Sequence, residues 1–376
     1  MFGWMISDFW THFVPHRCRR SVVLKALVAF GKLHRNFVEH AELTEDERCR
    51  TTSEAMASYF AAITELRRYT IAESMLVKAD VPLACLILIC CELLGGTCDD
   101  AIAHLDKGTA VLCTWAQEIE ASESRRSTNR SQEELDFAKI GEAFAALEIH
   151  AVAYNDARVP VLGDLCLLKP SRVQHKLLVS ESFSSPREAQ SSLVRLVSIA
   201  LQDLTSTNQC VTNIEVPQVV LAQRESLLAK YSRWLFALSD LESREAVWSP
   251  ATSRSARGQQ RIVAAMRLQH LTLQCLLEQS LDDPDRKVQY GSSSFDKHAK
   301  YLLHWPEIAI NTSSSQPVNR YASSCKPLRR TFSDDLGLSP LLRLLAFKTK
   351  DVSTQDDAVA LLSGISRLQG WFDPKS

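Results

Sequence analysis

The chain has 376 residues, of which 45% are hydrophobic and 23% charged, and this composition excludes a wholly disordered or collagen-like protein. Its 43 basic and 44 acidic residues leave a net charge of −1, so no global field draws it onto DNA, RNA or an anionic membrane. Only 12 glycines and 13 prolines occur, which favours long helices over strands and turns.

Apolar residues recur at three- and four-residue steps along most of the chain, a spacing that predicts helices. We expect helices over 21–40, 54–68, 81–94, 99–115, 133–155, 186–204, 219–241, 256–281, 340–348 and 353–368. We expect loops at the acidic segment 42–47, the polar segment 122–132 and the flexible Ser-, Pro- and Asn-rich segment 311–335. No period-two strand or repeat is visible, so the expected fold is all-α, a large irregular helical domain of ten or more helices over 1–376.

The segment 81–94 is apolar on nearly all sides, which predicts the most buried helix of the fold. It is shorter than the roughly 20 residues that span a bilayer, so a core helix is favoured over a membrane span. Gly95 and Gly96 should end it, and Gly108 on the next helix should allow a neighbouring helix to approach closely.

The cysteines point to an intracellular protein with reduced thiols. There are 11 of them, an odd number, and they are widely scattered. The N-terminus has no basic start, no unbroken apolar core and no small-residue cleavage site, so a secretory signal is not expected. Six basic residues lie between Arg17 and Arg35, and we expect a solvated helix face there rather than a nucleic-acid patch.

No motif for catalysis or metal binding is visible. The sequence contains no CxxC, HExxH, GxxxxGK[ST], GxGxxG or GxSxG pattern. We therefore expect no catalytic, cofactor-binding or metal site, and no enzymatic activity. His104 is interpreted as a histidine of the core or its rim rather than a catalytic residue.

Four segments taken in order carry a family resemblance. They are FWTHFVPH with SVVLKALVAFGKLH, then SYFAAITELRR, then PLACLILICCELLGGTCDDAIAHLDKGTAVL, and finally FSDDLGLSPLLRLLAFKTKD with AVALLSGISRLQGWFD. The set resembles the C-terminal regulatory region of fungal zinc binuclear cluster transcription factors, over nearly the whole chain. The matching positions are Glu92, Leu94, Gly96, Ala101, His104, Leu105, Gly108, Leu112, Leu336, Gly337, Pro340, Leu341, Ala346, Lys348, Asp351, Ala358, Leu361 and Leu362.

This sequence departs from the family pattern at several places. It lacks the six-cysteine DNA-reading cluster, and Thr349 and Val352 stand where cysteine and proline are common in the family. Residues 355–357 are Gln-Asp-Asp, where the family commonly has bases. The resemblance therefore implies a fold and a role, while direct sequence-specific DNA binding is not expected.

The resemblance implies a transcription-regulator-like protein of a fungus. It would be a helical effector or dimerisation module, linked to metabolic or secondary-metabolite gene regulation, with a DNA-binding regulator or a second copy as its protein partner. The implied location is the nucleus, and otherwise the cytoplasm. A truncated gene product would also explain the missing cluster.

The alternative is a repurposed helical scaffold that binds a ligand or serves an enzymatic step in a fungal biosynthetic pathway. Its pocket would include His104, Glu92 or Glu148.

Five aromatic residues crowd the N-terminus, which leaves two interpretations open. They are Phe2, Trp4, Phe9, Trp10 and Phe13. They could fold back onto the body of the protein, or some of them could anchor a partner subunit. Deleting residues 1–13 would separate these two interpretations.

Overall fold

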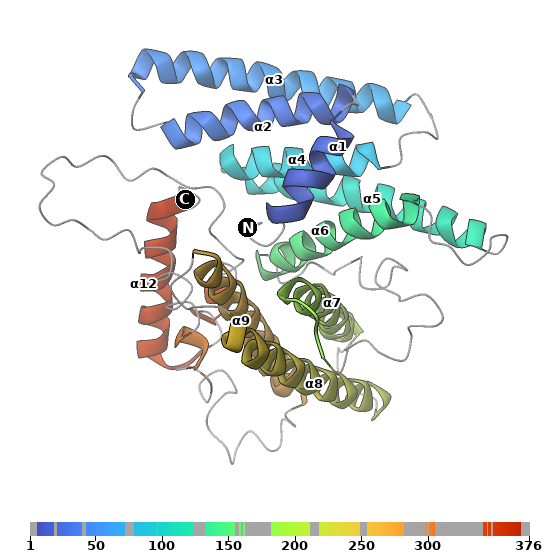
Figure 1. The fold of residues 1–376 in the computed structure, drawn as a ribbon, viewed down its shortest axis with the longest axis vertical. Coiled ribbons are helices and arrows are strands. Elements are labelled where there is room, and N and C mark those ends of the chain that lie inside the picture. The colour runs from blue at the N-terminus through green and yellow to red at the C-terminus, as the bar shows by residue number, and fades with distance from the viewer. Residues whose placement is uncertain are drawn as a thin grey trace, which may run out of the picture.

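The protein is helical throughout the part that can be described (Figure 1). The computed structural model describes residues 6–18, 21–39, 43–71, 79–95, 97–123, 132–154, 158, 161, 182–210, 218–248, 254–281, 298, 301–304, 341–343, 345–346 and 349–369. This part is 93% helical, with ten or more helices and no strand. The all-α prediction is therefore confirmed. The expected loop at 311–335 lies outside the described residues.

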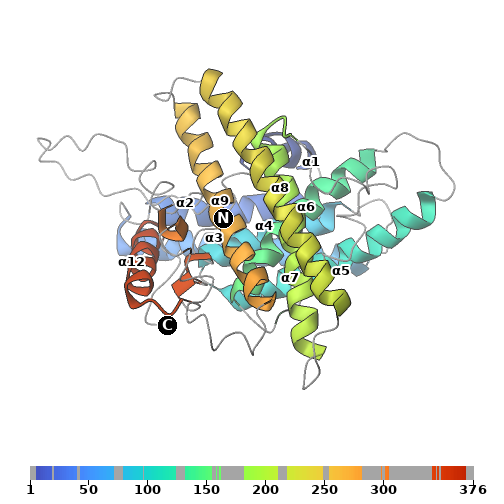
Figure 2. The ribbon, with the colours of Figure 1, turned by 90° about the horizontal axis from the view of Figure 1, so that it is seen from below.

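The helices form two groups joined through α6. The first group is η1 (Ile6–Phe13), α1 (Val14–Arg17), α2 (Ser21–Glu39), α3 (Glu45–Ile71), α4 (Asp80–Gly95), α5 (Cys98–Glu123) and α6 (Gln132–Tyr154). The second is α7 (Pro186–Cys210), α8 (Gln218–Trp248), α9 (Arg254–Leu281) and α12 (Val352–Gln369). In the first group α2 packs on α3 and on α4, and α4 packs on α5; α6 then meets α7, which packs on α8 and α9. Figure 2 shows α8 and α9 running across the direction of α2 and α3.

Helix α4 is the centre of the first group, as its composition predicts. All its residues from Asp80 to Leu93 are buried except Val81. A helix without a polar face is stable only when other helices cover it on every side. At its C-terminus the N–H of Thr97 donates to the carbonyl of Glu92 at 3.0 Å, a bond typical of a helix that ends at glycine.

Gly108 on α5 is a point of close helix approach, which confirms its predicted role. A Cβ atom at this position would overlap the ring of Phe144 on α6 and lie 3.2 Å from Cys85 Cβ on α4. Three helices meet here because one of them has no side chain. Any larger residue would push Phe144, which is fully buried, out of its place.

Several predicted helix ends are wrong. Helix α3 begins at Glu45 rather than at residue 54, so half of the segment 42–47 expected as an acidic loop forms its first turn. Thr44 and Glu47 cap that turn reciprocally: the N–H of Thr44 donates to Glu47 Oε2 at 2.9 Å, and the N–H of Glu47 donates to Thr44 Oγ1 at 3.4 Å. This is a capping box, which gives hydrogen-bond acceptors to two of the N–H groups that a helix start leaves unpaired.

Other helices also run past their predicted ends. Helix α5 reaches Glu123 rather than residue 115, α7 reaches Cys210 rather than 204, and α8 reaches Trp248 rather than 241. The apolar stripes stop earlier than the helices because the last turns are rich in polar residues. Extending a helix that has already formed is easier than starting one, so such residues can continue it.

The C-terminal part packs on α9 through a second hydrophobic cluster. Its members are Ala264, Ala265, Leu268, Cys275, Leu302, Leu341, Leu342, Leu345 and Ala358. Helix α12 starts as predicted, and Asp351 caps it by accepting from the N–H of Thr354 at 3.1 Å. Of the predicted helix 340–348, residues 341–343 and 345–346 are helical.

Candidate functional site

A buried polar cluster joins α3, α4 and α5. Glu92 on α4 accepts short hydrogen bonds from the hydroxyls of Tyr59 on α3 and Thr97. His104 on α5 places Nε2 3.3 Å from the Tyr59 oxygen and 3.9 Å from Glu92 Oε1. With the Tyr59 hydroxyl proton on the side of Glu92, the phenol oxygen is open to accept from His104 in the tautomer that carries its proton on Nε2. Nδ1 of His104 is buried without a partner among the described residues.

Burial controls the electrostatics of this cluster. Both Glu92 and His104 are only 8% exposed. Desolvation raises the pKa of Glu92, and the negative charge of Asp100 raises it further, while the Thr97 hydrogen bond opposes them. Desolvation also lowers the pKa of His104, helped by Lys107 and opposed by Asp100. Both groups are thus shifted toward their uncharged forms, which suits a structural clamp between three helices.

The sequence analysis proposed Glu92, His104 and Glu148 as possible members of one pocket. In the structure, Glu148 lies apart from the other two. Glu92 and His104 meet, with Tyr59 as a third member that no sequence pattern indicated. Glu148 lies on α6, where its Oε1 accepts from the N–H of Val161 at 2.8 Å. Desolvation raises the pKa of Cys113, and the charge of Glu148 raises it further. These three residues therefore do not form a single site.

A solvent-open groove of about 710 Å³ lies between α7 and α8. Its lining mixes apolar and polar side chains: Ile199, Gln202, Asp203, Ala222, Gln223, Ser226, Leu227 and Lys230. On its wall Arg224 Nε donates to Asp203 at 2.8 Å, and Arg224 is only 3% exposed. A groove of this size and mixed lining can hold a small molecule.

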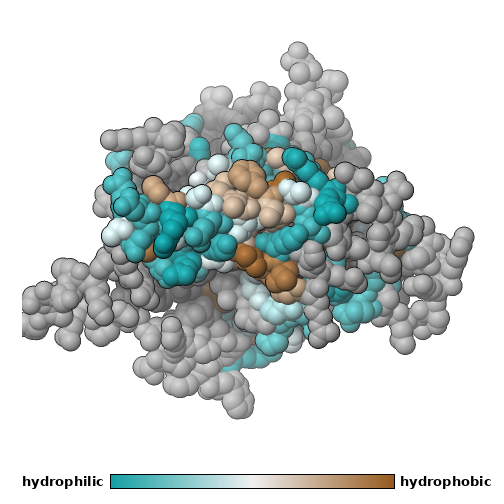
Figure 3. All heavy atoms as spheres, turned by 90° about the horizontal axis from the view of Figure 1, so that it is seen from above, coloured by the Kyte–Doolittle hydropathy of each residue, from teal (hydrophilic) through white to brown (hydrophobic). Residues whose placement is uncertain are grey.

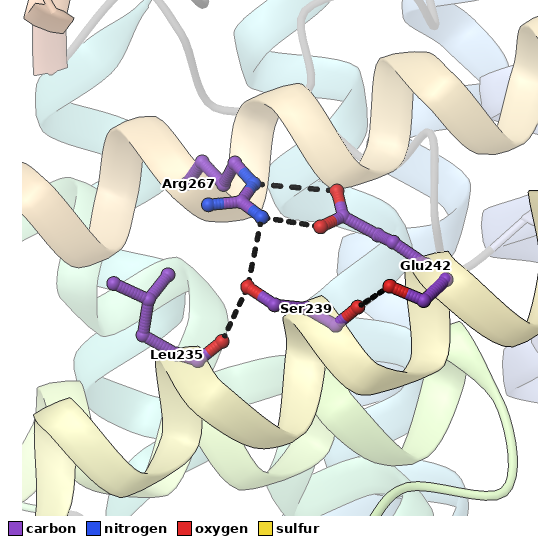
Figure 4. A network of polar contacts seen from close by, with 5 residues as sticks. Leu235, Ser239, Glu242 and Arg267 are labelled. Atoms are coloured by element: carbon purple, nitrogen blue, oxygen red, sulfur yellow. Dashed lines mark hydrogen bonds and ion pairs between the residues drawn. The ribbon is translucent and has the colours of Figure 1, made fainter.

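A polar network joins α8, which forms one wall of the groove, to α9 (Figure 4). Arg267 on α9 makes a two-pronged ion pair with Glu242 on α8, and its Nη2 also donates to Ser239 Oγ at 3.2 Å. The Ser239 hydroxyl in turn donates to the carbonyl of Leu235 at 3.0 Å. A fork of this kind fixes the register of two neighbouring helices, since it fits one relative position of the two side chains.

The core between α8 and α9 contains a buried histidine. His270 Nε2 lies 2.9 Å from the carbonyl oxygen of Tyr231, and its ring stacks on Trp234 at 5.3 Å between centroids. Burial lowers the pKa of His270 to about 4, so it is neutral at pH 7. The Tyr231 hydroxyl and His270 Nδ1 are buried without partners among the described residues. Neither residue belongs to the groove, and the cluster serves packing.

The N-terminal aromatics that are described pack onto the body of the protein. Phe9 and Phe13 are buried, at 5% and 7% exposure, with their rings 5.1 Å apart. The ring of Trp10 stacks on Phe30 of α2 at 6.1 Å. This packing favours the fold-back interpretation for these three residues. Phe2 and Trp4 lie outside the described residues.

Three of the six basic residues between Arg17 and Arg35 form ion pairs with carboxylates. Lys25 Nζ lies 2.6 Å from Glu65 on α3, Arg35 Nε lies 2.9 Å from Glu39, and Arg17 pairs with Asp136 on α6. These ion pairs favour the solvated-face interpretation over a nucleic-acid patch, because phosphate contacts need cations that are not already matched.

The α2–α3 pair carries several exposed large apolar side chains. Its exposed large apolar residues are Leu24 and Val28 on α2, and Met56 and Phe60 on α3. We call this surface the α2–α3 face. In Figure 3, which looks onto this end of the molecule, a brown and tan area lies between two teal hydrophilic areas. Phe60 is the most exposed of the four, at 59%.

Metal binding and membrane insertion find no support in the described part of the chain. No group of three or more His, Cys, Asp and Glu side chains there could hold a metal ion. Within the same ranges, no helix combines the length and the apolarity needed to cross a membrane. No protein-family model, no curated protein and no solved structure matches this chain.

Proposed function

We propose that this protein is a transcription-regulator-like effector of a fungus that works through contacts with other protein chains. The observation that supports this most directly is the α2–α3 face, an apolar surface on two long helices at one end of the molecule. The ordered resemblance to the regulatory region of fungal zinc cluster factors supplies the biological role. A nuclear location and a link to metabolic or secondary-metabolite genes belong to the same proposal.

Two further features are in keeping with a contact module. The clamp of Tyr59, Glu92 and His104 ties α3 to the core, so the face is presented on a supported helix. The basic residues Lys25 and Arg35 are engaged in ion pairs, so the N-terminal helices offer little to a phosphate backbone. DNA recognition would then come from a partner rather than from this chain.

The test is an effector assay in a fungal cell. The full chain is fused to an unrelated DNA-binding domain and directed to a reporter gene of intermediate basal expression, so that activation and repression are both visible. We expect a several-fold change in reporter output, lost in Phe60→Glu and kept in the matched control Phe236→Glu. Phe236 on α8 is 75% exposed and lies outside the face. Unchanged output from a stably expressed, nuclear fusion would refute the proposal.

A second function, small-molecule binding, is favoured by the groove between α7 and α8. Its volume of about 710 Å³ lies within the range of ligand pockets, and apolar walls combine with polar groups at its rim. A compound library tested by thermal shift would reveal such a ligand. Ala222→Trp, which fills the groove, should abolish the shift of a true ligand. Shifts that persist in this variant would count against the groove as the site.

A further inference from the structure

About half of the circumference of α3 is exposed, and a stripe runs along the middle of it. Seven of the exposed residues form this stripe, at three- and four-residue steps, and others, including Glu54 and Met56, flank it. In order the seven are Asp46, Arg50, Ser53, Ala57, Phe60, Thr64 and Arg68. The middle of the stripe is small or apolar and its two ends are charged. The stripe therefore has an apolar centre with a charged rim at each end.

The stripe is held by a firmly packed helix. On the opposite side of α3, Ala55, Ala62 and Leu66 are buried against the rest of the fold. The Tyr59 hydroxyl donates to Glu92 of α4, and the Tyr59 ring meets Phe60 edge-on at 5.6 Å. Phe60 therefore projects from a fixed backbone, and its exposed ring is pre-positioned for contact.

The two ends of α3 carry opposite charge. The first turn contains Glu45, Asp46 and Glu47, and the exposed end of the helix carries Arg67 and Arg68. A second α3 in antiparallel orientation brings each acidic end beside a basic end. A second α3 in parallel orientation brings like charges together, which is unfavourable.

We propose that the α2–α3 face pairs with the same face of a second copy of this chain, with the two α3 helices antiparallel. This inference rests on the proposed function and names its partner as the protein itself. The two-fold axis passes beside Ala57, the midpoint between Asp46 and Arg68. Phe60 then lies within about one turn of the axis in each copy, where aromatic anchors contribute most.

In the same register Ser53 lies across from Ala61, and Phe60 lies across from Glu54. Asp46 of each copy lies beside Arg68 of the other, and Arg50 lies across from Thr64, so no like charges face each other along the stripe. A second copy fits better than a partner of one charge sign, because the face carries both signs in a self-complementary order.

The first experiment compares two phenylalanines of equal chemistry. The mass of the purified full chain is measured by light scattering and by sedimentation over a range of micromolar concentrations. We expect a dimer for the wild type, and at least about a tenfold weaker dimer for Phe60→Glu, because the loss counts in both copies. Phe236→Glu should remain dimeric. A monomeric wild type, or equal effects of the two variants, would overturn the inference.

The second experiment tests the orientation. Asp46→Lys and Arg68→Glu should each weaken the dimer, and the double variant should restore it, because the exchanged charges again face each other. Additive weakening in the double variant would overturn the antiparallel register. Both ends are exposed, so circular dichroism should show an unchanged fold.

The outcomes separate this inference from the proposed function. A chain that changes reporter output but sediments as a monomer would overturn self-pairing and leave the effector role intact. A chain that dimerises through Phe60 but leaves reporter output unchanged would overturn the effector role and leave self-pairing intact.

Discussion

Gly108 and Gly31 are both helical glycines, and the structure predicts opposite effects when each is changed to alanine. In a helix interior, alanine is favoured over glycine by about 1 kcal/mol. Glycine is freer in the unfolded chain and therefore loses more conformational entropy on folding. At Gly31 on α2 a new Cβ meets nothing within 4 Å, so this gain should appear in full. Gly31→Ala should therefore stabilise the protein by about 0.5 to 1 kcal/mol.

At Gly108 the same gain is opposed by overlap. The new Cβ collides with the fully buried ring of Phe144 and presses on Cys85 Cβ at 3.2 Å. Inserting a methyl group into a well-packed core costs about 1 to 3 kcal/mol, since rings and backbone must shift. After the helix-propensity gain is subtracted, Gly108→Ala should destabilise the protein by up to about 2 kcal/mol.

The assay is urea unfolding of the wild type and both variants, followed by circular dichroism. The urea concentration at the midpoint of unfolding should rise for Gly31→Ala and fall for Gly108→Ala. The dependence of the unfolding free energy on urea concentration should be similar in all three proteins. Phe144→Leu gives a further control, because Gly108→Ala should cost less when the ring is absent. A Gly108→Ala variant as stable as Gly31→Ala would refute the close approach of α4, α5 and α6.

Four further outcomes are expected. Leu88→Asp, at a fully buried position of α4, should abolish cooperative thermal unfolding, because an unpaired carboxylate in a core is heavily penalised; wild-type-like melting would show that α4 is peripheral. Because the pKa of His270 falls to about 4 in the folded state, the unfolded chain binds more protons between about pH 6.5 and 4. Stability should thus fall by up to about 3 kcal/mol as the pH drops through this window, with His104 acting in the same direction, and His270→Gln should flatten part of that slope in urea titrations. Deleting residues 1–13 should lower the melting temperature without changing the oligomeric state, since Phe9 and Phe13 are buried; a shift to monomer with the fold intact would support the partner interpretation. In fluorescence anisotropy at physiological salt, the purified chain should bind duplex DNA weakly and without sequence preference, and specific binding would contradict this expectation.

The sequence by itself determined which segments are helical and which of them is central. Segment 81–94 is apolar on all sides, and such a helix has only one stable environment, the interior of a helical body. The start of α3 was also encoded locally, because Thr44 and Glu47 have the spacing of a capping box, although the apolar stripe alone placed the helix start at residue 54.

The tertiary structure alone decided which side chains meet. Periodicity tells which face of a helix is apolar but not which helix covers it, so no pattern joined Tyr59 of α3 to Glu92 of α4 and His104 of α5. The groove between α7 and α8 likewise depends on the angle and register of two packed helices. Phe60 is one of the large apolar residues of α3, yet it is exposed, because the core covers the side of α3 that carries Ala55, Ala62 and Leu66. Composition sets how much apolar surface a helix has, whereas packing geometry decides which part of that surface remains outside.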